Sequence, residues 1–226
     1  LIRTPYAGRN FETFSEDPLL ASRLVAAEIE GIQGEHLIAT VKHYAMNNQE
    51  QNRTSIDVRV DEQTMHEIEL PGFEAAIDAG TGAVMGAYNK VNGTFACENK
   101  TLLTDILRDR WGFEGWVMTD WFAAHSTVAA LTAGLDMEMP DGTYFGTELK
   151  TAVQNGGVAE RYVDRAVRRI LAVMDRFGLL DGSIPPRPPV TRRPARPSPW
   201  RSPRRAPPFC ATNTARSRSP AVARSR

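Results

Sequence analysis

The 226-residue sequence contains only two cysteines, no long apolar run and, in its last segment, no acidic residue. Cys97 and Cys210 stand alone and far apart, which excludes a disulfide framework and the paired spacing of a structural zinc site. A membrane-spanning helix needs about 20 consecutive apolar residues, and the sequence has no such run. The chain opens on LIRTPYAGRN, without a methionine or the pattern of a signal peptide, so the sequence assigns no compartment.

Acidic residues are absent from the last 43 residues, Ile184 to Arg226, which contain 11 Arg and 11 Pro. Residues 1–183 therefore hold 16 Lys and Arg against all 27 Asp and Glu. The last segment has too few apolar side chains to offset its chain entropy. We therefore expect a folded domain over residues 1–183, followed by a low-complexity Arg/Pro/Ser-rich tail over 184–226 that is disordered or derives from a shifted reading frame.

Within residues 1–183, two kinds of apolar pattern alternate along the chain. Asp17 followed by Pro18 is typical of a helix start, and Pro71 is expected to bend a later helix. The pattern predicts helices at 18–34, 61–80, 99–112, from 126 onward, 146–155 and 159–177, and buried strands at 37–44, 83–88 and 116–119. Strands that alternate with helices indicate a parallel sheet built from βαβ units.

Three of the predicted helices carry an apolar stripe that we expect to face the core. The stripes are Leu19, Leu20, Leu24, Ile29 and Ile32 in the first helix; Leu102, Leu103, Ile106 and Leu107 in the third; and Val163, Val167, Ile170, Leu171 and Met174 in the last.

Polar side chains stand where each predicted strand ends. Lys42 and His43 end the first, Tyr88 ends the second and Asp120 follows the third. In (β/α)8 barrels the chemistry lies at this carboxyl edge of the sheet. A whole barrel takes about 250 residues, whereas this sequence offers only about four strands, three of which have the ranges given above. The expected fold class is therefore α/β, a partial (β/α)8 TIM-type barrel corresponding to roughly the second half.

Each polar residue at this edge has a structural alternative. Asp120 could cap the helix that follows, Arg9 could pair with Glu12 or Glu16, and Arg53 could be a surface charge. Together the residues suit a sugar, because hydroxyl groups need several charged hydrogen-bond partners and an indole can pack on the apolar face of a pyranose. The set comprises Asp120, Arg9, Lys42, His43, Arg53, Tyr88 and Trp121. No strand-to-helix turn carries the glycine cradle of a phosphate site.

Four motifs in this order extend the interpretation: GRNFETFSEDP, KHYAMNNQEQNR, MGAYNKVNG and VMTDW. Over residues 1–183 the sequence closely resembles glycoside hydrolase family 3, on its β-glucosidase-like branch. The branch that hydrolyses N-acetylglucosaminides resembles it less. That branch carries a His-Asp dyad in a glycine-rich loop after the Lys-His pair, where AMNNQEQNR stands here.

The resemblance implies a retaining β-glucosidase-type glycosidase that needs no metal or organic cofactor. It implies that Asp120 is the catalytic nucleophile. It also implies that the substrate is held by Arg9, Lys42, His43, Arg53, Tyr88 and Trp121. The implied substrate is a β-glucoside or a related oligosaccharide, and no membrane partner is expected.

The general acid/base of such an enzyme is implied to come from a following α/β sandwich domain, so we expect no acid/base residue in this chain. Glu50, Glu98 and Glu138 lie near strand-end loops, but no spacing argument assigns any of them the role. Without a proton donor we expect this chain alone to hydrolyse natural β-glucosides weakly or not at all.

Two alternatives from other classes stay open. One is a non-catalytic remnant that still binds sugar. The other is an interaction protein whose Arg-rich tail binds nucleic acid through phosphate contacts. The tail has one Trp, one Phe and no folded reading module, which disfavours nucleic acid as the partner.

Overall fold

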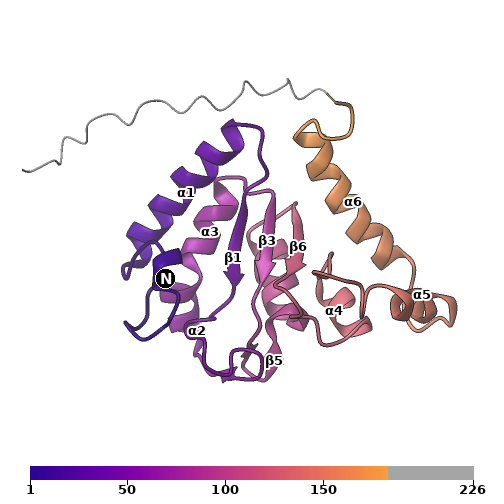
Figure 1. Cartoon of the computed structure of the whole chain (residues 1–226), viewed down its shortest axis with the longest axis horizontal. Helices are drawn as coiled ribbons and strands as arrows, with labels where there is room; N and C mark the ends of the chain where they lie inside the picture. The colour runs from indigo at the N-terminus through magenta and orange to yellow at the C-terminus, as the bar shows by residue number, and fades with distance from the viewer. Residues whose placement is uncertain (183–226) are drawn as a thin grey trace, which may run out of the picture. The chain divides into compact units, whose positions relative to one another are not determined.

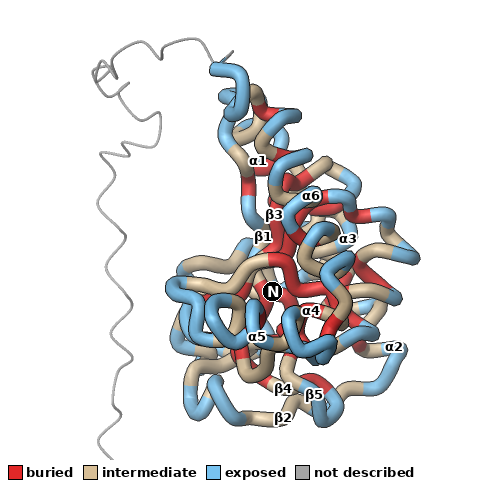
Figure 2. Tube along the Cα trace, turned by 90° about the vertical axis from the view of Figure 1, so that its right-hand side faces the viewer, coloured by how far each residue is buried: buried red, intermediate tan, exposed pale blue. Residues whose placement is uncertain are grey.

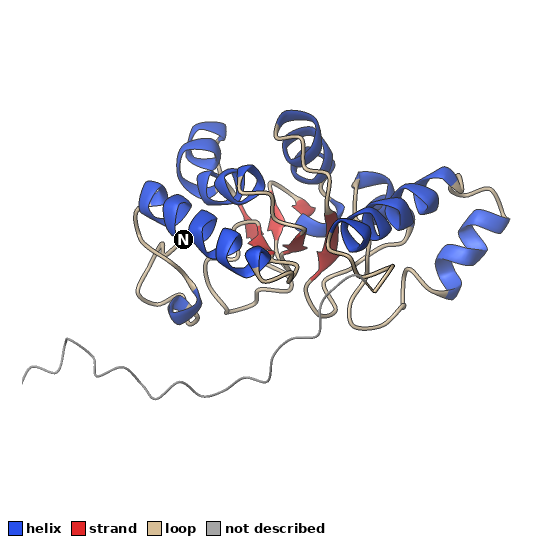
Figure 3. Cartoon of the chain, turned by 90° about the horizontal axis from the view of Figure 1, so that it is seen from above, coloured by secondary structure: helices blue, strands red, loops and turns tan. Residues whose placement is uncertain are grey.

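The computed structural model describes residues 1–182, and the predicted tail, residues 184–226, lies outside the described residues. The described part is an α/β fold in which helices flank a short sheet (Figure 1, Figure 3). Its helices are the 3-10 helix η1 Asn10–Glu12, α1 Pro18–Gly34, α2 Glu62–Thr64, the π-helix η2 Met65–Glu69, α3 Pro71–Asp78, the 3-10 helix η3 Ala96–Glu98, the π-helix η4 Thr101–Arg110, α4 Val128–Ala133, α5 Thr147–Gln154 and α6 Arg161–Arg176. Its strands are β1 Thr40–Tyr44, β2 Asp57–Val58, β3 Ala83–Gly86, β4 Lys90–Val91, β5 Thr94–Phe95 and β6 Trp116–Thr119.

The central sheet contains three parallel strands in the order β1-β3-β6. The strand predicted at 116–119 is confirmed residue for residue, and β1 and β3 lie inside their predicted ranges. Met137 forms a parallel bridge with Met118, so the segment after α4 runs alongside β6. The alternation of helices and strands therefore predicted the parallel sheet correctly.

Helix α1 begins as its sequence predicts. The Oδ1 atom of Asp17 accepts hydrogen bonds from the backbone N–H groups of Leu19, at 2.7 Å, and Leu20, at 3.2 Å. Farther along the chain, Asp61 caps α2, and the helix predicted over 61–80 is divided into α2, η2 and α3, with Pro71 opening the last of them. This division is expected because proline lacks the N–H that would continue the ladder.

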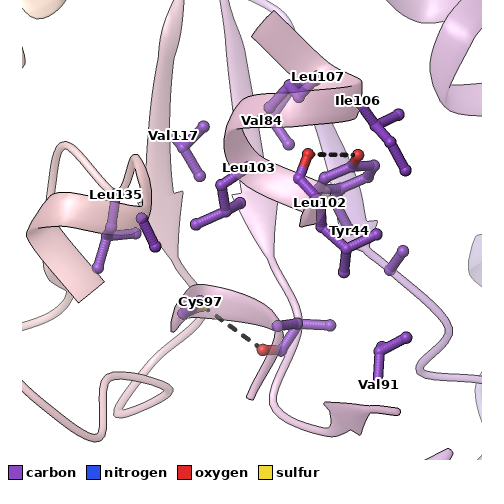
Figure 4. Close-up of a cluster of buried hydrophobic side chains, with 14 of the residues drawn as sticks. Tyr44, Val84, Val91, Cys97, Leu102, Leu103, Ile106, Leu107, Val117 and Leu135 are labelled. Atoms are coloured by element: carbon purple, nitrogen blue, oxygen red, sulfur yellow. Dashed lines mark hydrogen bonds between the residues drawn. The ribbon is translucent and has the colours of Figure 1, made fainter. Parts of the chain in front are cut away.

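The largest group of buried side chains lies between the sheet and η4 (Figure 4). All four residues of the predicted stripe in η4 are buried: Leu102, Leu103, Ile106 and Leu107. The hydroxyl of Tyr44, at the end of β1, donates to the carbonyl oxygen of Leu102 at 2.9 Å. Figure 2 shows buried positions along the strands.

The other two predicted stripes were partly wrong. In α1, Leu19, Leu20 and Leu24 are exposed, whereas Ala21, Val25 and Ile29 are buried. Helix α1 packs on α3 through Val25 and Ile29, and no described element covers the leucines. In α6, the exposed residues include Val167 and Leu171, whereas Val173 packs on Ala83 and Trp116. Periodicity identified the apolar residues of each helix but not which of them another element covers.

A second, small sheet was missed by the sequence analysis. It has the order β2-β4-β5, and each of its strands has two residues, too short for a periodic signal. Asn92 and Gly93 join β4 to β5 with φ angles of 50° and 98°. Asn-Gly with both φ angles positive is the preferred two-residue hairpin turn, so this local signal was present in the sequence.

The thiol of Cys97 lies against the end of β3. It is fully buried, and its Sγ donates to the carbonyl oxygen of Ala87 at 3.5 Å. A Cβ atom at Gly86 would lie 2.6 Å from that sulfur, so position 86 requires glycine while Cys97 is in place. Burial raises the pKa of the Cys97 thiol well above its ordinary value.

A buried carboxylate joins three elements near the start of β6. The side chain of Asp136 is 0% exposed and accepts from Arg108 Nη2 at 2.7 Å, Arg169 Nη1 at 2.9 Å and the N–H of Val117 at 2.9 Å. Burial lowers the pKa of Arg108 to about 10, although Asp136 opposes the shift. This Asp136 cluster links η4, α6 and β6.

No helix within residues 1–182 is long and apolar enough to cross a membrane.

Candidate active site

Asp120 lies directly after β6, beside the end of β1. Its N–H donates to the carbonyl oxygen of Gly86 at 3.1 Å, which ties it to the end of β3. Its Oδ1 accepts from the N–H of Trp121 at 2.7 Å, and the Nε2 of His43 lies 3.1 Å from its Oδ2. Helix α4 begins only at Val128, so the alternative that Asp120 caps the following helix is wrong.

The carboxyl group of Asp120 is held in its ionised form. The residue is 8% exposed, and this burial alone would raise its pKa. The neighbouring His43, the N–H of Trp121 and the hydroxyl of Tyr88 outweigh burial and lower the pKa of Asp120 to about 2. At neutral pH the group is therefore a carboxylate, as a nucleophile requires.

Tyr88 follows β3 and lies beside Asp120. Burial, together with the negative charge of Asp120, raises the pKa of Tyr88 to about 12. Its hydroxyl is therefore protonated at neutral pH and able to donate. The guanidinium of Arg53 lies 4.3 Å from the centroid of the Tyr88 ring, and its Nη1 donates to Glu50 Oε2 at 2.5 Å. Arg53 is thus fixed over Tyr88 rather than being a free surface charge.

Arg9 and Lys42 meet at a single carboxylate. Glu12, in η1, pairs through Oε1 with Arg9 Nε and through Oε2 with Lys42 Nζ, the latter at 3.2 Å. The structural alternative in which Arg9 pairs with Glu12 is therefore confirmed. A cavity of about 60 Å³ is lined by both cations, His43, Glu12 and Glu50. Three of the predicted substrate-binding residues thus surround one polar cavity.

The remaining predicted residue, Trp121, lies on the surface beside Asp120 and is 45% exposed. No ring contact with its indole is present among the described residues. The role of Trp121 as a wall for the bound sugar therefore stays a prediction.

The three glutamates that the sequence left open have different surroundings. Glu50 is ion-paired with Arg53. Glu138 accepts from the N–H groups of Tyr144, at 2.9 Å, and Phe145, at 2.7 Å. Glu98 is the exception: its Oε1 is buried without a hydrogen-bond partner in the described chain.

For two further residues, the structure shows contacts that the sequence analysis did not predict. His125 lies in the loop before α4, just ahead of the helix predicted from 126 onward, and stacks on Phe95 with ring centroids 3.5 Å apart. Glu12 was weighed only as a partner of Arg9. Its second contact joins a loop to a strand about 30 residues away, which no local pattern reveals.

The geometry brings an ionised carboxylate, a protonated phenol and several cations to one sheet edge. Such a set can attack an electrophilic carbon while it donates hydrogen bonds to hydroxyl groups. Residues 1–182 contain no group of three or more His, Cys, Asp or Glu side chains arranged to hold a metal ion.

Comparison with known proteins gives one consistent family. A family model described as the glycosyl hydrolase family 3 N terminal domain matches residues 1–173. A beta-glucosidase from Rhizobium radiobacter is 46% identical over 182 residues, which cover 79% of this chain and 22% of that protein. The thermostable beta-glucosidase B of Acetivibrio thermocellus is 46% identical over 176 residues, or 76% of this chain and 23% of that protein.

Solved structures agree with the sequence relatives. DesR, a beta-glucosidase from Streptomyces venezuelae in complex with D-glucose, matches with a TM-score of 0.80 and 51% identity, over 83% of this chain and 26% of that one. Beta-glucosidase 3B from Thermotoga neapolitana in complex with glucose matches with a TM-score of 0.74 and 39% identity, over 79% of this chain and 27% of that one. The chain thus spans about a quarter of the length of these relatives.

Proposed function

The chain belongs to glycoside hydrolase family 3, and we propose that it carries the nucleophile side of a retaining β-glucosidase site, with Asp120 as the nucleophile. The relatives named beta-glucosidase support a glycosidase, and the solved neighbours bound to glucose support a glucoside as substrate. The single observation that carries the proposal is the ionised carboxylate of Asp120 between His43 and Tyr88.

In the proposed reaction, an oxygen of Asp120 forms a bond to the anomeric carbon while the bond from that carbon to the leaving oxygen breaks. Water then hydrolyses the resulting glycosyl ester and regenerates the carboxylate. Arg9, Lys42, His43 and Arg53 donate hydrogen bonds to sugar hydroxyls, and Trp121 packs on the apolar face of the ring. Tyr88 donates to the nucleophile and orients it.

We further propose that residues 1–183 form part of a (β/α)8 barrel domain, roughly its second half, with 184–226 as a separate low-complexity segment. The parallel order β1-β3-β6, continued by the bridge at Met137, supports a curved parallel sheet. The gathering of site residues at the carboxyl ends of the strands matches the location of active sites in such barrels.

A retaining glycosidase needs a second carboxyl group about 5–5.5 Å from the nucleophile to protonate the leaving oxygen. Of the three glutamates considered, Glu50 is ion-paired with Arg53, Glu138 accepts from two backbone N–H groups, and no hydrogen bond or ion pair among the described residues links Glu98 to Asp120. We propose that the 226-residue chain, assayed alone, cleaves natural β-glucosides weakly, since acid assistance contributes about 10²–10⁴-fold. Glucosides with leaving groups that depart without a proton should suffer least.

The test is covalent labelling with 2-deoxy-2-fluoro-β-D-glucosyl fluoride. Its fluoride leaves without a proton donor, and the fluorine at C2 slows hydrolysis of the ester, so the glycosyl-enzyme accumulates. We expect intact-mass spectrometry to show one label and peptide mapping to place it on Asp120. D120N should stay unlabelled, because an amide is a poor nucleophile. A label on another residue, or none on the wild-type chain, would contradict the proposal.

A further inference from the structure

The carboxylate of Glu12 is the only described group that contacts both Arg9 and Lys42. Each oxygen takes one cation: Oε1 binds Nε of Arg9, and Oε2 binds Nζ of Lys42. Arg9 precedes η1 and Lys42 lies in β1, so the contact fixes a loop side chain relative to a strand side chain. Both cations are partly exposed beside the cavity of about 60 Å³.

Two long cationic side chains at one cavity repel each other and have many rotamers. Glu12 opposes both effects, because its charge lies between them. Burial raises the pKa of Glu12, but its contacts with Arg9 and Lys42 outweigh burial and lower it. The bond to Glu12 in turn raises the pKa of Arg9. Glu12 is therefore ionised at neutral pH and keeps its charge between the two cations.

The contacts also determine which donors stay available. A guanidinium has five N–H donors in one plane and an ammonium has three. Glu12 takes the Nε–H of Arg9 and one N–H of Lys42, which leaves the terminal Nη groups of Arg9 and the other N–H groups of Lys42 for further acceptors. Because the fork of Arg9 is planar, fixing Nε fixes the direction of its Nη groups.

We propose that Glu12 is a positioning residue for sugar recognition. It holds Arg9 and Lys42 in one geometry, so that their remaining donors meet neighbouring hydroxyl groups of a pyranose. This inference rests on the proposed function and extends it to a residue that acts only through the two cations.

The test compares E12Q, E12D and the control E16Q, all in the full 226-residue chain. E12Q keeps the shape of the side chain and removes its charge, and Glu16 is an exposed acid near Glu12 without a contact to Lys42. The readouts are glucose affinity by calorimetry and the fluoroglucosyl fluoride concentration that gives half-maximal labelling. We expect E12Q to weaken both about tenfold or more, in line with the loss of charge-assisted hydrogen bonds. E12D should recover part of the loss, and E16Q should match the wild type.

A double-mutant cycle with K42A distinguishes positioning from simple stabilisation of the fold. If Glu12 acts through Lys42, E12Q should weaken glucose binding much less in the K42A background than in the wild type. Additive effects, or an E12Q chain that melts earlier yet binds glucose normally, would overturn the inference. If E12Q fails to fold, E12D is compared with the wild type instead. Half-maximal labelling of E12D at the same fluoroglucosyl fluoride concentration as the wild type would then overturn the inference as well. A wild-type chain that neither binds glucose nor becomes labelled would instead refute the proposed function, and the inference with it.

Discussion

Aspartates lie near both ends of strand β6, and their surroundings differ. Near the start, the side chain of Asp136 is 0% exposed, and both of its oxygens accept hydrogen bonds from fixed donors on η4, α6 and β6. At the end, Asp120 uses Oδ1 for the N–H of Trp121, whereas the ion-pair partner of Oδ2 among the described residues is the Nε2 of His43, at 3.1 Å. A carboxylate whose two oxygens both accept hydrogen bonds from fixed donors holds elements together. A carboxylate with one oxygen less completely engaged can react.

The cations around the two aspartates follow the same contrast. Arg108 is nearly buried and also donates to the carbonyl oxygens of Phe113 and Gly115. Arg9 and Lys42, at the other end, are partly exposed and pair with the carboxylate of Glu12 rather than with Asp120. In barrel enzymes the carboxyl ends of the strands carry chemistry and the amino ends carry stability. The sequence of β6 thus joins a structural end to a proposed reactive end.

The strongest test of this contrast exchanges each aspartate for asparagine. D136N leaves Arg108 and Arg169 near an uncharged partner, so we expect a loss of about 3–5 kcal/mol in the free energy of unfolding. D120N removes a carboxylate that is only partly satisfied, and it should cost much less. Urea denaturation of both variants measures the difference. Equal losses would show that the two ends do not differ in this way.

A second test uses acid. The folded-state pKa of Asp120, about 2, is below its ordinary value of 3.8. Its stabilisation is therefore complete above about pH 4 and is lost as the pH falls through about 2. The free energy of unfolding of the wild type minus that of D120N should fall by about 2 kcal/mol from pH 5 to pH 2. A difference independent of pH would mean that Asp120 is not held ionised by its neighbours.

The smallest expected effect serves as the reference for the other two. Lys100 pairs with Asp105 on the exposed side of η4, and the side chains of both residues are exposed. Exposed ion pairs contribute little because water and salt screen them. K100A should leave the urea midpoint unchanged within the error of the measurement. A clear loss of stability in K100A would mean that burial does not explain the sensitivity of D136N.

The sequence predicted the proposed reactive end of β6 better than the structural end. The apolar run from Trp116 to Met118, shortly before Asp120, is a local signal, and the strand was found residue for residue. The bonds of Asp136 to η4 and α6 depend on side chains 28 and 33 residues away, which no local pattern encodes. The roles of Arg9, Lys42 and His43 came from the family resemblance, whereas the second contact of Glu12 needed the fold.

Burial was predicted least well. An apolar stripe shows that a helix has a face to cover, but the covering element comes from elsewhere in the chain. Leu19 and Leu171 are therefore exposed although their periodicity is helical. The stripe of η4 succeeded because the sheet lies directly against it.

The thiol of Cys97 makes opening of this core measurable by chemistry. Only a thiolate alkylates readily, and a sulfur enclosed beside Gly86 with a raised pKa is protected from reagent. With Cys210 replaced by serine, the rate at which iodoacetamide modifies the chain would therefore report how often the interior transiently exposes itself to solvent.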